Sequence, residues 1–219
     1  MSSHSPLLTV AVLLASAFII VAFRKNAYVS KGVFFGAGLL ALFFSLQAVS
    51  LVLAVGPHSY VLGNFEAYKG IELVVDGLSA YASLVIALIC LPIFWNATFT
   101  AQEETKSAAG MYALLSLLAA AMHGIVYAGD IFNLFVFVEI SSLAATAIIA
   151  IKGTKQSIEA TFKYLVMSAL GSGSILFAVA LLYMITGHLN MGLMRETLSL
   201  TASLYPLNYS AAIGLLLVG

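Results

Sequence analysis

The chain has 219 residues, of which 62% are hydrophobic and only 8% are charged, with nine Lys and Arg balancing nine Asp and Glu. A soluble domain carries about 25% charged residues, so this composition excludes an ordinary soluble enzyme, a disordered protein and an electrostatic nucleic-acid-binding protein. The mean hydropathy of +1.08 indicates that lipid is the solvent for most of the chain, which we expect to be a multi-pass protein of the cell membrane.

Apolar runs between polar breaks predict the membrane spans in chain order. Six full spans are predicted over residues 6–23, 32–55, 78–98, 108–127, 131–151 and 158–185. Each run is close to or above the roughly 20 residues that cross a bilayer, and a lipid solvent requires these runs to be helices. The polar stretch 56–76 predicts a small outer hairpin, and 186–201 predicts a polar, partly amphipathic connection. The predicted fold class is therefore an all-α, polytopic helix bundle.

A last apolar run starts near Tyr205 and stops at Gly219. It has only about 15 residues, which is too short to cross a bilayer. We therefore expect either a half-helix or a chain interrupted in a seventh span. The whole of 1–219 is interpreted as one membrane domain, with 1–98 forming the first three spans and 108–219 a second part.

Basic residues predict the orientation of the bundle. Every second predicted loop, or the helix end beside it, is basic. These positions are Arg24, Lys25, Lys31, Lys106, Lys152 and Lys155. Only Lys69 and Arg195 fall on the other side. Because cytoplasmic loops carry an excess of Lys and Arg, the N-terminus is expected outside.

Glu139 is the residue of greatest functional interest. It lies about 12 Å along the fifth predicted span, near the middle of a bilayer. A carboxylate at this depth is expensive and usually faces a bundle interior or an ion pathway. Ser142 and Thr146 follow at spacings that place them on the same helix face. This stripe favours a proton pathway, and the alternative is a hydrogen bond that only glues two helices together.

Two further titratable residues are candidates for the same pathway. Lys163 lies about 8 Å inside the sixth predicted span, where it either takes part in proton transfer or extends to the headgroups as a snorkelling lysine. His123, on the fourth span, is either a relay or a neutral histidine bonded to a carbonyl. From helix rise alone, a direct ion pair between Glu139 and Lys163 is not expected.

Other polar residues favour structural roles. Asp130 and Asp76 immediately precede predicted helices and are expected to cap them. The four histidines and the single cysteine, Cys90, are too scattered to predict a metal site. No nucleophile paired with a base is apparent, so no cofactor and no redox or hydrolytic centre is predicted in this chain. Whether it serves a larger enzyme complex stays open.

Three segments of the chain resemble a known family. They are Gly129–Glu139 (GDIFNLFVFVE), Ser157–Tyr164 (SIEATFKY) and Tyr183–Met191 (YMITGHLNM). They are similar to the proton-pumping antiporter-like subunits of Mrp-type Na⁺/H⁺ antiporters, of membrane-bound hydrogenases and of respiratory complex I. The resemblance extends over about residues 70–192. The sequence around Asp130 is most similar to that of the D-type subunit of Mrp antiporters and its hydrogenase relatives.

The resemblance implies roles for two residues and a context for the chain. Glu139 matches the fifth-helix glutamate that tunes a proton-carrying lysine, and Lys163 matches a sixth-helix lysine of several members. The family continues to about fourteen helices in two inverted repeats, which implies that 108–219 is the first part of a repeat and that the chain stops just before the family's seventh-helix lysine. The implied partners are other membrane subunits, including one that supplies the rest of the fold, together with protons and lipid; Na⁺ exchange stays open.

Two other functions remain as alternatives at this stage. One is a scaffolding subunit that packs against partners and conducts nothing. The other is an independent small transporter, which the short last span and the missing second repeat argue against. In every case the composition predicts no nucleic-acid partner.

Overall fold

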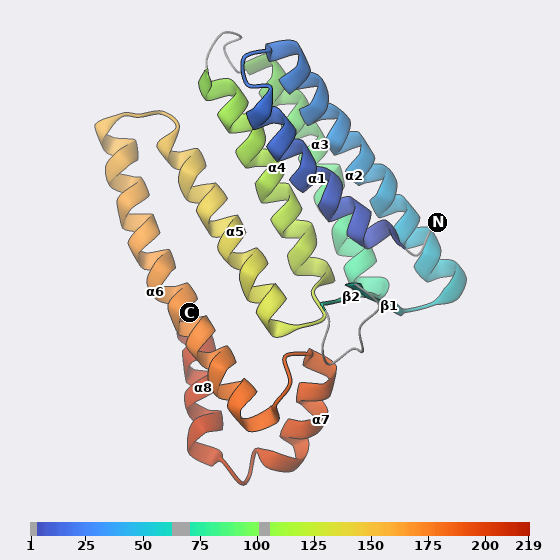
Figure 1. Cartoon of the computed structure of the whole chain (residues 1–219), viewed down its shortest axis with the longest axis vertical. Helices are drawn as coiled ribbons and strands as arrows, with labels where there is room; N and C mark the ends of the chain where they lie inside the picture. Colours follow the sequence, from blue (N-terminus) through green and yellow to red (C-terminus); the bar gives the residue numbers. More distant parts are fainter. Residues whose placement is uncertain (1–3, 63–70, 101–105) are drawn as a thin grey trace.

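The computed structural model of the chain describes residues 4–62, 71–100 and 106–219, and it is a bundle of helices with one short hairpin (Figure 1). Its described elements, in chain order, are α1 (Ser5–Ala22), α2 (Ala27–Val55), β1 (His58–Val61), β2 (Glu72–Val75), α3 (Gly77–Thr100), α4 (Lys106–Tyr127), α5 (Ile131–Ala150), α6 (Lys155–Thr186), α7 (Met191–Thr201) and α8 (Pro206–Val218). Among the described residues, six helices, α1 to α6, are long and apolar enough to cross a membrane, and α8 is a shorter apolar helix. The predicted all-α, polytopic bundle is confirmed.

Two spans begin earlier than their hydropathy predicts. The helix α2 starts at Ala27, where Asn26 Oδ1 accepts a hydrogen bond from the backbone N–H of Val29 at 3.2 Å. The helix α6 starts at Lys155, where Thr154 Oγ1 accepts from Ser157 N at 3.2 Å. The predicted starts at 32 and 158 are wrong because the first turns of both helices are polar, so hydropathy does not include them in the span. The capping residues Asn and Thr are nevertheless preferred at helix starts.

The helices α1 to α4 pack into a four-helix unit with an aromatic centre. Phe34 lies between Phe94 and Tyr112, with ring centroids 4.1 Å and 4.8 Å away. Alanines fill the interfaces around this stack, among them Ala37, Ala41, Ala119 and Ala120. Such small residues let helix backbones approach closely in a lipid solvent, where close packing is a main source of helix association.

The helices α5, α6 and α8 extend this unit on one side (Figure 1). The helix α5 packs between α4 and α6, and α8 lies along the second half of α6. The backbone of α8 approaches α6 at Gly171, where an added Cβ atom would lie 2.9 Å from the carbonyl oxygen of Gly219. Glycine at this position therefore permits the contact between the two helices.

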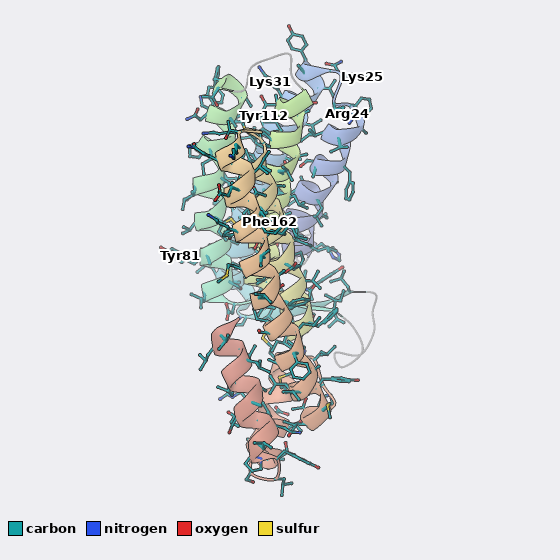
Figure 2. The ribbon with its side chains drawn as sticks, turned by 90° about the vertical axis from the view of Figure 1, so that its left-hand side faces the viewer. Arg24, Lys25, Lys31, Tyr81, Tyr112 and Phe162 are labelled. Atoms are coloured by element: carbon teal, nitrogen blue, oxygen red, sulfur yellow. The ribbon has the colours of Figure 1, made fainter. Side chains whose placement is uncertain are left out.

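Basic residues and the hairpin occupy opposite ends of the bundle. Arg24, Lys25 and Lys31 lie at the end where α1 turns into α2 (Figure 2), and the α5–α6 connection lies at the same end (Figure 1). The strands β1 and β2 lie at the other end and pair antiparallel, with His58 opposite Val75. The basic residues thus gather at the end opposite the hairpin, which is the arrangement that the sequence predicts, and from their excess we expect that end to face the cytoplasm.

The hairpin end connects the two parts of the bundle. The loop between α4 and α5 lies beside β2, where Gly129 N donates to Glu72 O at 2.9 Å. On its other side the same loop accepts a hydrogen bond from Met191 N at 3.1 Å through Gly129 O. A Cβ atom at Gly129 would lie 2.9 Å from Glu72 O. A larger residue here would therefore push the α4–α5 loop away from β2. This connection holds the start of α5 in place.

Candidate functional site

Asp130 sets the start of α5 and therefore the depth of Glu139. Its Oδ1 accepts a hydrogen bond from the backbone N–H of Asn133 at 2.6 Å, as an N-cap does. Its other oxygen is buried without a hydrogen-bond partner among the described residues. Burial raises the pKa of the Asp130 carboxyl above its usual value, and the neighbouring Glu72 adds to this rise. Counted from Ile131, Glu139 lies about 12 Å into the helix.

Glu139, Ser142 and Thr146 share the face of α5 that meets α6. Ser142 Oγ hydrogen-bonds to Ser168 Oγ of α6. Thr146 is buried, and its Oγ1 donates to Ser142 O at 2.7 Å. Glu139 is half-buried on the same face, and its Oε2 is buried without a hydrogen-bond partner among the described residues. The structure therefore places a carboxylate and three hydroxyls along one line between two spans.

Lys163 lies on another side of α6. Its Nζ donates to Glu159 Oε1 at 2.7 Å, and the side chains of the pair are 72% and 60% exposed. Ser168, which faces α5, is five residues further on and so lies about 140° around the helix from Lys163. Because α6 starts at Lys155, Lys163 is about 12 Å from its first residue and not the 8 Å that the sequence predicts. Lys163 therefore lies on a different face of α6 from Ser168, which meets α5.

His123 also lies away from Glu139. It is 1% exposed inside α1–α4, and its Nδ1 is 3.0 Å from Ser83 Oγ. Between α4 and α5 the ring of Phe137 packs onto Gly124. Glu139, two residues after Phe137, consequently points about 200° away from α4. Of the sequence candidates, the structure brings Glu139, Ser142 and Thr146 together and keeps Lys163 and His123 apart from them.

Asp76 caps α3 at the hairpin end of the bundle. Ser79 N donates to Asp76 Oδ1 at 2.7 Å, and Asp76 N donates to Ser79 Oγ at 2.8 Å. The backbone hydrogen bond from Ser79 lowers the pKa of the Asp76 carboxyl. Within the described ranges, no group of three or more His, Cys, Asp or Glu side chains could hold a metal ion.

Sequence reasoning missed the serines Ser168, Ser45 and Ser83, which bond to residues of other helices, and it did not pair Glu159 with Lys163. Glu159 could have been found, because it precedes Lys163 by four residues and Glu–Lys pairs at this spacing face each other on a helix. Ser168, Ser45 and Ser83 give no comparable signal. Their partners are on other helices, and a serine in an apolar run has the same pattern whether it meets a neighbour or only its own backbone.

The fold and the polar face define a multi-pass membrane protein with a carboxylate inside the bundle. Residues 128–219 match the family model described as NADH:quinone oxidoreductase/Mrp antiporter, TM. The N-type subunit of the NADH-quinone oxidoreductase of Desulforudis audaxviator is 36% identical over 87% of the chain and 38% of its own length. The D-type subunit of the Na⁺/H⁺ antiporter of Bacillus subtilis is 28% identical over 84% of the chain and 37% of its own length.

A solved structure has the same fold. The membrane-bound sulfane sulfur reductase, described as an archaeal respiratory membrane complex, contains a chain that superposes with a TM-score of 0.87 at 28% identity, covering 97% of this chain and 43% of that one. The predicted resemblance to the antiporter-like membrane subunits is thus confirmed, and the chain is related to them by sequence and by fold. It spans less than half the length of each of these relatives.

Proposed function

We propose that this chain is a membrane subunit of a multi-subunit complex of the cell membrane that translocates protons or cations, and that Glu139 is its proton-carrying group. The proposal is supported by relatives whose names include a Na⁺/H⁺ antiporter subunit and a quinone oxidoreductase subunit. The partners are other membrane subunits of the complex. The transported ion is the proton, and Na⁺ is the candidate for the ion that is exchanged against it.

The position of Glu139 carries this proposal. A carboxyl group about 12 Å inside a span needs a partner or a proton, because an uncompensated charge there is expensive. One oxygen of Glu139 is buried and has no partner among the described residues, so the carboxyl is not held in a finished ion pair within this part of the chain. A group in this condition is suited to gaining and losing a proton.

The hydroxyls beside Glu139 supply a path for the proton. Ser142 and Ser168 hydrogen-bond to each other across α5 and α6, and Thr146 continues the line one turn towards the cytoplasm. Hydroxyl groups both donate and accept hydrogen bonds, so they can pass a proton while staying neutral. We propose that Glu139 alternates between a proton-loaded state and a state paired with a lysine.

The lysine in this scheme is Lys163 or a lysine of a partner subunit. Lys163 is on the exposed side of α6 and is paired with Glu159, so its coupling to Glu139 would be indirect. Lys163 would exchange its pairing with Glu159 for a pairing with an acidic group of a neighbouring subunit. This exchange would change the electrostatic free energy of a proton on Glu139.

The test is Glu139→Gln in the whole complex, which keeps the shape of the side chain and removes its titration. Proton translocation is expected to be lost while the complex assembles at wild-type yield. Ser141→Ala is the control on the same helix, because the Ser141 hydroxyl donates to Val138 O of its own helix and has no place in the proposed path. Wild-type translocation in Glu139→Gln would leave the chain as a scaffolding subunit that conducts nothing.

A further inference from the structure

A second line of buried polar groups lies inside α1–α4, on the opposite side of α5 from Glu139. Ser83 Oγ is 2.9 Å from Ser45 Oγ and 3.0 Å from His123 Nδ1. The three side chains come from α2, α3 and α4 and are at most 1% exposed. Buried polar groups of this kind are expensive unless hydrogen-bonded, and here each is bonded to the next.

A pocket on the outer face approaches this line. It has a volume of about 870 Å³, and its polar lining residues include Glu72, Asp76, Ser79, Asn190 and Glu196. None of the described residues that line it is basic, so the pocket is electronegative and attracts protons and cations. Its lining also includes Ala82, which precedes Ser83 in the sequence, and Val126.

Ser79 and Ser83 connect the pocket to the buried line. They are four residues apart on α3, which places them one turn apart on the same helix face. Ser79 lines the pocket and is bonded to Asp76. The two residues are therefore only about 6 Å apart along the helix axis.

The line also has a polar neighbour on its inner side. Ser116 is seven residues before His123 on α4, so it lies two turns deeper on nearly the same face. It is fully buried, and its Oγ has no hydrogen-bond partner among the described residues. Buried hydroxyls in proteins are usually satisfied by a side chain, the backbone or an internal water. His123 thus has a buried hydroxyl on each side, that of Ser83 and that of Ser116.

We propose that Ser83 and His123 form a proton-transfer line, separate from Glu139, that exchanges protons with the outer aqueous phase through this pocket. In each step the Ser83 hydroxyl gives its proton to His123 Nδ1 and takes one from a hydronium ion that enters from the pocket. Ser83 is neutral before and after, the hydronium becomes water, and the imidazole becomes an imidazolium. Ser45 is a positioning residue, because by donating to Ser83 it directs the Ser83 proton at Nδ1.

Few other titratable groups surround His123. The helix α1 carries none over Ser5–Ala22, and α2 carries only Tyr28 and Lys31, near its cytoplasmic end. The remaining groups on the elements packed around it are Tyr81 and Cys90 on α3, Lys106, Tyr112 and Tyr127 on α4, Glu139 on the far side of α5, and Glu72 on β2. His123 is therefore the group in this line that can hold an extra proton.

The test is nitrogen-15 NMR of histidine-labelled protein in its assembled complex, which distinguishes the neutral imidazole from the imidazolium. The His123 signals are assigned by their absence in His123→Asn. As the outside pH is lowered, we expect the His123 signals to respond in the wild type and in Ser83→Thr, which keeps the hydroxyl. In Ser83→Ala we expect this response to be lost.

Two controls separate a relay from a purely structural contact. Ser141→Ala removes a hydroxyl that donates only to Val138 O of its own helix, and it should leave the His123 response unchanged. Glu139→Gln should also leave it unchanged, so this inference and the proposed function fail independently. A His123 signal that ignores the outside pH, or one that responds equally in Ser83→Ala, would overturn the inference.

Discussion

The ring of Phe137 on α5 packs directly onto Gly124 on α4, and an added Cβ atom at Gly124 would overlap the ring. This contact fixes the rotation of α5. Phe137 faces α4 and the cluster around Tyr127, while Glu139 is about 200° further around the helix and faces away. One glycine therefore determines that the carboxyl and His123 lie in different polar lines.

Gly124→Ala should destabilise the chain by about 1–3 kcal/mol, because the extra methyl group forces α4 and α5 apart. Thermal unfolding of the purified protein in detergent measures this loss. Gly110→Ala is the matched control on the same helix, since nothing lies within 4 Å of an added Cβ there. It should be neutral or stabilising by up to about 1 kcal/mol. Equal unfolding of the two variants would mean that the Phe137 contact is not tight.

Asp130→Asn should stabilise the protein at neutral pH. Asn is as good an N-cap as Asp, and it removes a carboxyl whose pKa is raised from 3.8 by burial. A raised folded pKa means that the folded state binds the proton more tightly, so stability falls as the pH rises from 3.8 through the folded value. The advantage of Asp130→Asn should therefore disappear below that window, which unfolding at several pH values will test.

Asp76→Asn should show the opposite sign. Its pKa is lowered from 3.8, mainly by the Ser79 backbone hydrogen bond, so the ionised form stabilises the folded state above 3.8 and this contribution is lost as the pH falls through the folded value. At neutral pH, Asp76→Asn should be less stable than the wild type. The pH assignments fail if both variants shift stability in the same direction at neutral pH.

The hydrogen bond between Ser142 and Ser168 should be measurable as a coupling energy. Hydroxyl pairs between membrane helices contribute on average about 0.6 kcal/mol in double-mutant cycles. A cycle of Ser142→Ala and Ser168→Ala, read by unfolding in detergent, should give a value of this order. Strict additivity would show that the two hydroxyls do not interact in the folded protein.

Lys163→Gln should lower proton translocation without changing stability. The Lys163–Glu159 pair is largely exposed in the described chain, and exposed pairs contribute at most about 1 kcal/mol. Lys163→Arg keeps the charge and is the control. If Lys163→Gln transports protons at the wild-type rate, Lys163 is a snorkelling lysine and takes no part in transport.

Hydropathy was sufficient to predict the six spans, and basic residues were sufficient to predict which loops share an end. Both signals are summed over many residues, so single errors matter little. The starts of α2 and α6 were missed because they depend on one capping residue each, Asn26 and Thr154. The depth of Glu139 was predictable from helix rise, since its span begins where Asp130 indicates.

Contacts between helices were not predictable in the same way. The separation of His123 from Glu139 depends on the Phe137 ring at Gly124, and the partner of Ser142 is a serine 26 residues away. Helix periodicity gives the face of a residue but not the neighbour that the face meets. For this reason the sequence grouped Glu139, Lys163 and His123 into one pathway, while the structure places them in three environments.

The most direct test of the account is the initial rate of proton translocation by the assembled complex, reconstituted in liposomes, with Glu139→Gln. A group that accepts and donates a proton on the pathway typically contributes at least about a hundredfold to the rate. We predict a loss of that order in Glu139→Gln and a wild-type rate in Ser141→Ala, whose hydroxyl bonds only within its own helix. A wild-type rate in Glu139→Gln, in a fully assembled complex, would contradict the role of Glu139.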